Sequence, residues 1–185
     1  MEEQIIQIIQ VNIQKKVKPL KEKDWTVCVY MCGTDLETRS AAATTDLLEM
    51  LAADIPEDIN VLVMTGGTKQ WNPYEDDKVA IENGVIKEGA YVTPDSEHTQ
   101  VYLIDDNKMN LVYTYKENLN MGDVCTLESF LEFALYYAPA KHLMVNLWNH
   151  GGGPIGGVAY DSANNFDSLS ISELSYVMSG LSEKI

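Results

Sequence analysis

The sequence has no long apolar run and little positive charge. No segment approaches the roughly 18 consecutive apolar residues that a membrane-spanning helix needs, so we expect none. The chain begins with acidic and polar residues, without the basic region and apolar run of a secretory signal. It carries 28 acidic against 13 basic residues, a net charge of −15. Such a surface repels nucleic acid and favours cationic peptides or divalent metals as partners, or simply keeps the protein soluble.

Cysteine is also scarce. The chain has only Cys28, Cys32 and Cys125, too few for a disulfide framework. If Cys28 and Cys32 share a strand, their Cα atoms lie about 13 Å apart at about 3.3 Å per residue, too far to bridge. No pair of cysteines, and no combination of cysteine and histidine, has the spacing of a zinc site. A disulfide-stapled fold and a structural zinc module are therefore excluded.

The most informative segment is residues 143–153, which read LMVNLWNHGGG. A short apolar run after an amphipathic helix predicts a buried parallel strand. His150 follows that strand at the edge where open α/β sheets bind ligands. The three glycines behind it allow a substrate backbone to approach, and their N–H groups can face an oxyanion. The pattern points to acyl transfer, and the alternative is a histidine that merely precedes a flexible turn.

The rest of the chain alternates strand and helix patterns. Residues 25–31 and 60–65 predict strands with a helix between them, a right-handed βαβ unit. Short strands are expected at residues 79–81, 85–87, 100–104 and 110–115. A hairpin turn at 105–108 joins the last two, which we expect to form an antiparallel insertion outside the main sheet.

Two helices complete the pattern. Asp123 is the expected N-cap of a helix that runs to about Ala138 and precedes the His150 strand. Ser170 and Glu173 have the spacing of a capping box for the last helix. Residues 1–24 are expected to form an N-terminal arm, helical or disordered.

Acyl transfer needs a nucleophile, and two cysteines are candidates. Cys125 falls in the first turn of the helix that Asp123 opens, where the helix dipole lowers a thiol pKa. Cys32 ends the first strand and therefore lies at the same edge of the sheet as His150. Cys28 lies in the middle of that strand and is expected in the core.

Carboxylates gather at the same edge. Asp35, Glu37, Asp161 and Asp167 follow strand or turn positions there and suit calcium or the cationic end of a substrate. Asp161, Asn165 and Asp167 have part of the spacing of a calcium loop, without its glycine. We therefore take Asp161 and Asp167 as candidate metal ligands.

Several motifs together resemble a known family. They are Tyr30-Met31 before Gly33-Thr34-Asp35-Leu36-Glu37, Asn120-Met121-Gly122-Asp123 before Thr126-Leu127-Glu128, Leu147-Trp148-Asn149-His150-Gly151-Gly152-Gly153, and Asp161 with Leu169-Ser170. In this order, from about residue 25 to the C-terminus, they resemble the clostripain family of cysteine peptidases. The resemblance implies a caspase/gingipain-like three-layer α/β sandwich with a mostly parallel sheet. It also implies a bacterial peptidase that cleaves after Arg or Lys.

The resemblance assigns roles to several residues. His150 becomes the general acid/base of a Cys–His dyad, and the N–H of Gly151 becomes an oxyanion donor. We assign Asp35 and Asn149 to substrate binding. No cofactor is expected to be required, Ca²⁺ is an option, and the partner is a peptide or protein substrate. A secreted or cell-envelope location is favoured.

One element of the family pattern is missing. The family places its nucleophile at the end of the next strand, which would begin near Ile185, and none of the three cysteines occupies that place. Residues 25–185 are therefore expected to be the histidine-bearing part of the peptidase domain, without the C-terminal part of the sheet and inactive alone. The chain is a fragment, a processed light chain or a catalytically dead homologue, and we favour a fragment whose partner is the rest of the protease. The alternative is a non-catalytic flavodoxin-like module that binds a metal or cationic peptide.

Overall fold

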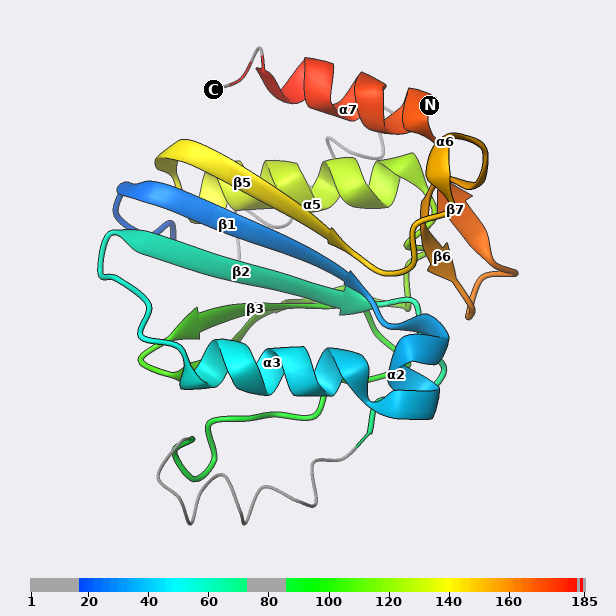
Figure 1. Cartoon of the computed structure of the whole chain (residues 1–185). Helices are drawn as coiled ribbons and strands as arrows, with labels where there is room; N and C mark the ends of the chain where they lie inside the picture. Colours follow the sequence, from blue (N-terminus) through cyan, green and yellow to red (C-terminus); the bar gives the residue numbers. More distant parts are fainter. Residues whose placement is uncertain (1–16, 73–85, 183, 185) are drawn as a thin grey trace.

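A computed structural model describes residues 17–72, 86–182 and 184. These residues form a five-stranded sheet of order β4-β3-β2-β1-β5 and a two-stranded sheet of β6 and β7 (Figure 1). The strands are β1 (Lys23–Cys32), β2 (Ile59–Gly66), β3 (Gln100–Asp105), β4 (Lys108–Thr114), β5 (Ala140–Trp148), β6 (Val158–Asp161) and β7 (Asp167–Leu169). The helices are α2 (Thr34–Ser40), α3 (Ala42–Ala52), α5 (Val124–Tyr137), α6 (Gly153–Gly156) and α7 (Ile171–Ser182).

The central strand is β1, which pairs in parallel with β2 on one side and β5 on the other. Its residues alternate between two apolar layers, as the period of two in a strand requires. Cys28, Tyr30 and Cys32 enter one core cluster, and Val29 and Met31 enter the other. Both faces of this strand are therefore buried, which confirms the predicted first strand and the parallel pairing of β1 with β2.

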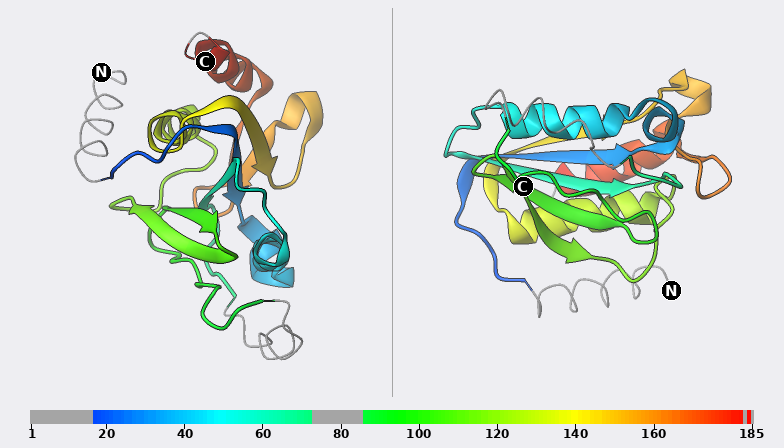
Figure 2. Two further views of the ribbon diagram at one scale, coloured as in Figure 1. Left: turned by 90° about the vertical axis from the view of Figure 1, so that its left-hand side faces the viewer. Right: turned by 90° about the horizontal axis from the view of Figure 1, so that it is seen from below.

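Helices cover both faces of the sheet (Figure 2). On one face, Leu47 and Leu51 of α3 pack on the cluster that contains Val29 and Met31. On the other face, Phe130 of α5 packs on the second cluster, together with α7. β3 is the one strand of this sheet that is antiparallel to the other four. The result is the expected three-layer sandwich with a mostly parallel sheet.

The antiparallel hairpin of β3 and β4 is confirmed, but its expected place outside the main sheet is wrong. Asp106 and Asn107 form its turn with φ of 50° and 57°. β3 pairs with β2 and so extends the main sheet. It does so because β3 is apolar on both faces and nearly all of it is buried. Residues 79–81 lie outside the described residues, and the part of 85–87 that is described forms no strand.

Among the described residues the strand that precedes His150 is parallel, as predicted, but it lies at the edge of the sheet and is only partly buried. Within the described residues β5 pairs only with β1. Leu143, Val145 and Leu147 pack on the core beneath α5. On the opposite face Met144 is 52% exposed, whereas Trp148 at the end of the strand packs on the cluster that contains Leu47 and Leu51 of α3. The apolar run is therefore buried mainly on the face toward α5.

The predicted helix caps are confirmed. The Asp123 carboxylate accepts a hydrogen bond from the N–H of Cys125 at 2.8 Å. At the start of α7 the Ser170 N–H donates to Glu173 at 2.8 Å, and the Glu173 N–H donates to the Ser170 hydroxyl at 3.2 Å. In the described part of the chain no helix has the length and apolarity to cross a membrane.

Part of the expected N-terminal arm is described. The N–H of Leu20 donates to the carbonyl of Tyr137 at 2.8 Å. Leu20 and Val17 also pack on the cluster beneath α5. Residues 17–22 therefore lie along the end of α5 before β1 begins, and residues 1–16 lie outside the described residues.

Candidate active site

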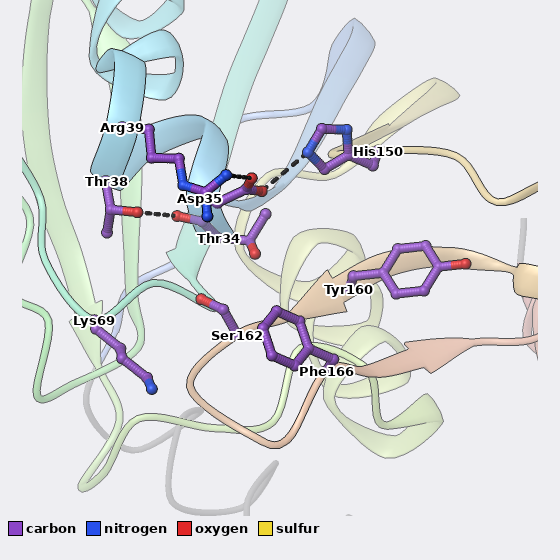
Figure 3. Close-up of a pocket in the computed structure, with 9 residues that line it drawn as sticks. All are labelled: Thr34, Asp35, Thr38, Arg39, Lys69, His150, Tyr160, Ser162 and Phe166. Carbon is purple, nitrogen blue, oxygen red and sulfur yellow. Dashed lines mark hydrogen bonds and ion pairs between the residues drawn. The ribbon is translucent and has the colours of Figure 1, made fainter.

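A pocket of about 450 Å³ lies where β1 ends and where the loop after β5 begins (Figure 3). α2 forms one wall, and the loop between β6 and β7 forms the other. The charged and aromatic residues that line the pocket are Asp35, Arg39, Lys69, His150, Tyr160 and Phe166. The carboxyl edge of the sheet, where ligands of α/β folds bind, therefore carries the main candidate site.

The two residues before His150, Trp148 and Asn149, are hydrogen-bonded to other elements of the fold. The indole N–H of Trp148 donates to Asp46 of α3. The side-chain amide of Asn149 donates to the carbonyl of Cys32 at the end of β1, and its oxygen accepts from the N–H of Tyr160 in β6. These bonds hold the chain rigidly as it leaves β5.

The side chain of Asn149 is hydrogen-bonded at both ends, and its assignment to substrate binding stays a prediction. Both ends of its amide hydrogen-bond to main-chain groups, and its side chain is not among those that line the pocket. An amide whose donor and acceptor are already paired gains little from a substrate. The two hydrogen bonds of Asn149 therefore fix the chain immediately before His150.

His150 and Asp35, predicted separately, meet in the pocket. The Nε2 atom of His150 lies 3.0 Å from an Asp35 carboxylate oxygen, although the two residues are 115 positions apart. The other Asp35 oxygen lies 3.4 Å from the Arg39 guanidinium, one helical turn further along α2. The His150 side chain is 51% exposed, so it is accessible to a substrate.

The three glycines after His150 have different structural requirements. A Cβ at Gly152 would lie 1.9 Å from the Tyr160 hydroxyl, and Gly153 has a φ of +66° that favours glycine. The N–H of Gly152 donates to the carbonyl of Gly157. Around Gly151, by contrast, nothing lies within 4 Å of a would-be Cβ. The open space beside His150 is therefore at Gly151, where a substrate backbone has room to approach.

The cysteines of the described chain do not line this pocket. Burial raises the pKa of the Cys28 thiol to about 12. Burial, together with the nearby Asp161 carboxylate, also raises the pKa of the Cys32 thiol well above its usual value. Cys28 is a core residue as predicted, and a buried thiol with a raised pKa makes Cys32 a poor nucleophile. Cys125 lies in the first turn of α5, as expected, and is partly exposed.

This difference in burial predicts which thiols react. At about pH 8 the reagent DTNB should modify Cys125 in the folded chain and leave Cys28 and Cys32 intact, because a raised pKa keeps both buried thiols protonated. All three should react in denaturant. Mass spectrometry of the labelled peptides gives the measurement. Native-state labelling of Cys32 at the rate of Cys125 would contradict the burial of Cys32.

Two of the predicted edge carboxylates are buried and satisfied. Glu37 accepts bonds from the N–H and the hydroxyl of Thr44 at 2.9 and 2.7 Å, and from the N–H of Asn72 at 2.8 Å. Asp161 accepts bonds from the N–H groups of Met121, Ala163 and Asn164 at 2.7, 2.8 and 3.1 Å. Both residues are fully buried. Their hydrogen bonds hold the loops around the pocket in place, and their carboxylates are not accessible to a substrate.

The proposed metal ligands are engaged in the same way. The oxygens of Asp161 already accept the three main-chain bonds, and Asp167 accepts a bond from the Asn120 side chain at 2.6 Å. Calcium needs six to eight oxygen ligands at one point. Within the described ranges no group of three or more His, Cys, Asp and Glu residues is placed to hold a metal. The assignment of Asp161 and Asp167 as calcium ligands therefore stays a prediction.

Two cations of the pocket were not predicted from the sequence. Arg39, which pairs with Asp35, and Lys69 both line the pocket, so its charge is mixed and not purely acidic. Arg39 could have been found, because a basic residue four positions after an acidic one pairs with it on a helix. Lys69 follows β2 in a loop and gave no such signal.

Comparisons with known proteins agree on the fold. A sequence model of the clostripain family matches residues 29–185. A secreted C11 cysteine protease from Bacteroides thetaiotaomicron, solved with an irreversible peptide inhibitor, is 18% identical with a TM-score of 0.57, over 85% of this chain and 39% of that one. A structure of such a protease from the same organism, called "iotapain", is 13% identical with a TM-score of 0.51, over 88% and 44%.

At these identities the solved structures show the fold alone. This chain spans about two fifths of their length. A search of curated proteins found no match.

Proposed function

This chain belongs to the clostripain family, and from that premise we propose that it is the histidine-bearing part of a cysteine endopeptidase that cleaves after Arg or Lys. The observation that carries the proposal is the placement of His150. It is half-exposed in a pocket at the carboxyl edge of the sheet, and its imidazole contacts Asp35. Peptidases of this family need no cofactor. Family membership favours a peptidase over the flavodoxin-like binding module.

The proposed chemistry uses His150 twice. Its imidazole removes the proton of a cysteine thiol, and the thiolate attacks the carbonyl carbon of the scissile bond. The imidazolium then gives this proton to the leaving amine as the C–N bond breaks. Water, deprotonated by His150, hydrolyses the thioester, which releases the acid and restores the thiol.

We propose that the cysteine comes from a strand beyond Ile185. Among the described strands β5 pairs only with β1, so its other edge can accept another parallel strand. Such a strand would end at the same edge of the sheet as His150. Residues 25–185 are then one part of the peptidase domain, and the remaining C-terminal part is its partner.

The neighbouring residues have supporting roles in this proposal. The N–H of Gly151 faces the oxyanion, since the space beside this residue is open. Asn149 fixes the loop through its bonds to Cys32 and Tyr160. Asp35 is the carboxylate among the pocket-lining residues, and charge alone makes it a candidate contact for a basic substrate side chain. We also propose that the protein is bacterial and is secreted or located in the cell envelope.

Cleavage specificity tests the proposal. The full-length protein should hydrolyse peptide amides that carry Arg or Lys before the cleaved bond at least about a hundredfold faster, in kcat/KM, than matched Ala or Glu peptides. The 185-residue chain assayed beside it should hydrolyse none of them. Equal turnover of the Ala peptide would contradict the specificity. Activity of the 185-residue chain that Cys125→Ser abolishes would place the nucleophile within this chain.

A further inference from the structure

We propose that Asp35 is a positioning residue for His150, which holds the imidazole through Nε2 so that Nδ1 is the atom that exchanges the proton with the nucleophile. The site would then be a Cys–His–Asp arrangement and not a dyad. This inference rests on the proposed function, because it says which of the two ring nitrogens of His150 exchanges the proton in that reaction.

The contact itself selects the tautomer. An ionised carboxylate only accepts hydrogen bonds, so the bond at 3.0 Å between Asp35 and Nε2 requires a proton on Nε2. In a neutral imidazole Nδ1 then carries the lone pair and acts as the base. Figure 3 shows Nε2 turned toward Asp35 and the second ring nitrogen on the far side of the ring.

Asp35 is held firmly enough to orient another residue. Thr34, immediately before it, is fully buried and has a φ of 41°, a backbone conformation that β-branched residues rarely adopt. Its N–H donates to the carbonyl of Gly67 at 3.1 Å. Strain of this kind persists where the surrounding structure enforces it, and it is often found at functional sites. The second oxygen of the Asp35 carboxylate lies 3.4 Å from the exposed Arg39 guanidinium.

His150 is held from its own side as well. Trp148 and Asn149 tie the two preceding residues to α3, β1 and β6. The backbone at His150 therefore has little freedom, and the bond to Asp35 orients the imidazole ring. A base whose orientation is fixed before the reaction loses less entropy in the transition state.

The competing role for Asp35 is contact with a basic substrate side chain. One oxygen of Asp35 faces His150, and the other faces Arg39. A substrate cation would have to displace Arg39 from this carboxylate. The two roles differ in kinetics, since a positioning residue acts on kcat for every substrate, whereas a substrate contact acts on KM for basic substrates.

Asp35→Asn in the full-length protein distinguishes these roles. We expect kcat to fall about a hundredfold with KM changed less than about threefold, by the same factor on Arg and Lys substrates, because the amide no longer fixes the productive tautomer. Asp35→Glu keeps the carboxylate and should recover part of the loss. Asp95→Asn is the matched control, because Asp95 forms a 2.7 Å pair with His98 of similar exposure. It lies outside the pocket, and its loss should leave kcat unchanged.

The tautomer gives a readout that does not depend on catalysis. In the 185-residue chain with ¹⁵N-labelled histidine, at about pH 9 where histidines are neutral, the His150 spectrum should show protonated Nε2 and unprotonated Nδ1. Asp35→Asn should convert this signal to a mixture of tautomers. The His150 signals are assigned by their loss in His150→Gln.

The outcomes separate this inference from the proposed function. A rise in KM with unchanged kcat, no effect of Asp35→Asn, or a protonated Nδ1 in the wild type would each overturn the positioning role. If Asp35→Asn does not fold, the tautomer of His150 in the wild-type protein and the kinetics of Asp35→Glu still distinguish the two roles of Asp35. A wild-type full-length protein without peptidase activity would instead refute the proposed function, and the tautomer would still report on Asp35.

Discussion

His150→Ala in the full-length protein should lower kcat/KM on Arg and Lys peptide amides by at least about a thousandfold. Without the imidazole the thiol keeps its proton, and the leaving amine has no acid to protonate it. The fold should be unaffected, because the His150 side chain is 51% exposed and lies in the loop after β5. Initial rates on the two substrates, with circular dichroism to confirm folding, give the measurement.

His142→Ala is the matched control for this experiment. His142 lies near the start of the same strand, β5, and is exposed. Its ring contacts Trp25 at the end of the sheet opposite to the pocket. This variant should retain full activity. If His150→Ala kept its rate within tenfold of the wild type, His150 would not be the general base.

Asp161→Ala should lower the free energy of unfolding by about 3–5 kcal/mol, the range for breaking a buried hydrogen-bonded charge. The substitution leaves the N–H groups of Met121, Ala163 and Asn164 without their acceptor. Because Asp161 is fully buried, water cannot replace these bonds. Urea unfolding of the 185-residue chain measures the effect.

Asp167→Ala serves as the comparison for Asp161→Ala. Asp167 is exposed, and its bond to Asn120 links two surface side chains, so the loss should be about 1 kcal/mol or less. Equal losses for the two variants would contradict the structural role of Asp161. The same variants test the calcium prediction. A rise in Tm with millimolar Ca²⁺ that either substitution abolishes would support a calcium site.

Much of the local structure could be read from neighbouring residues. The cap at Asp123, the capping box of Ser170 with Glu173 and the turn at 105–108 were predicted correctly, because each depends on hydrogen bonds between residues a few positions apart. The apolar period identified β1, β2 and the strand before His150. It also placed His150 at the carboxyl edge, because consecutive parallel strands end at the same edge of a sheet.

Only the tertiary structure decided which strands and side chains each of these elements packs against. An apolar run shows that a strand buries surface, but not which strands lie beside it. The hairpin was therefore wrongly separated from the main sheet, and among the described residues β5 is less buried than expected. The roles of the acidic residues depended on distant partners in the same way. Asp35 faces the pocket beside His150. Glu37 and Asp161 are buried with their bonds made. Sequence determined which residues reach the carboxyl edge, and folding determined which of them stay accessible, because Glu37 and Asp161 are buried whereas Asp35 remains partly exposed in the pocket.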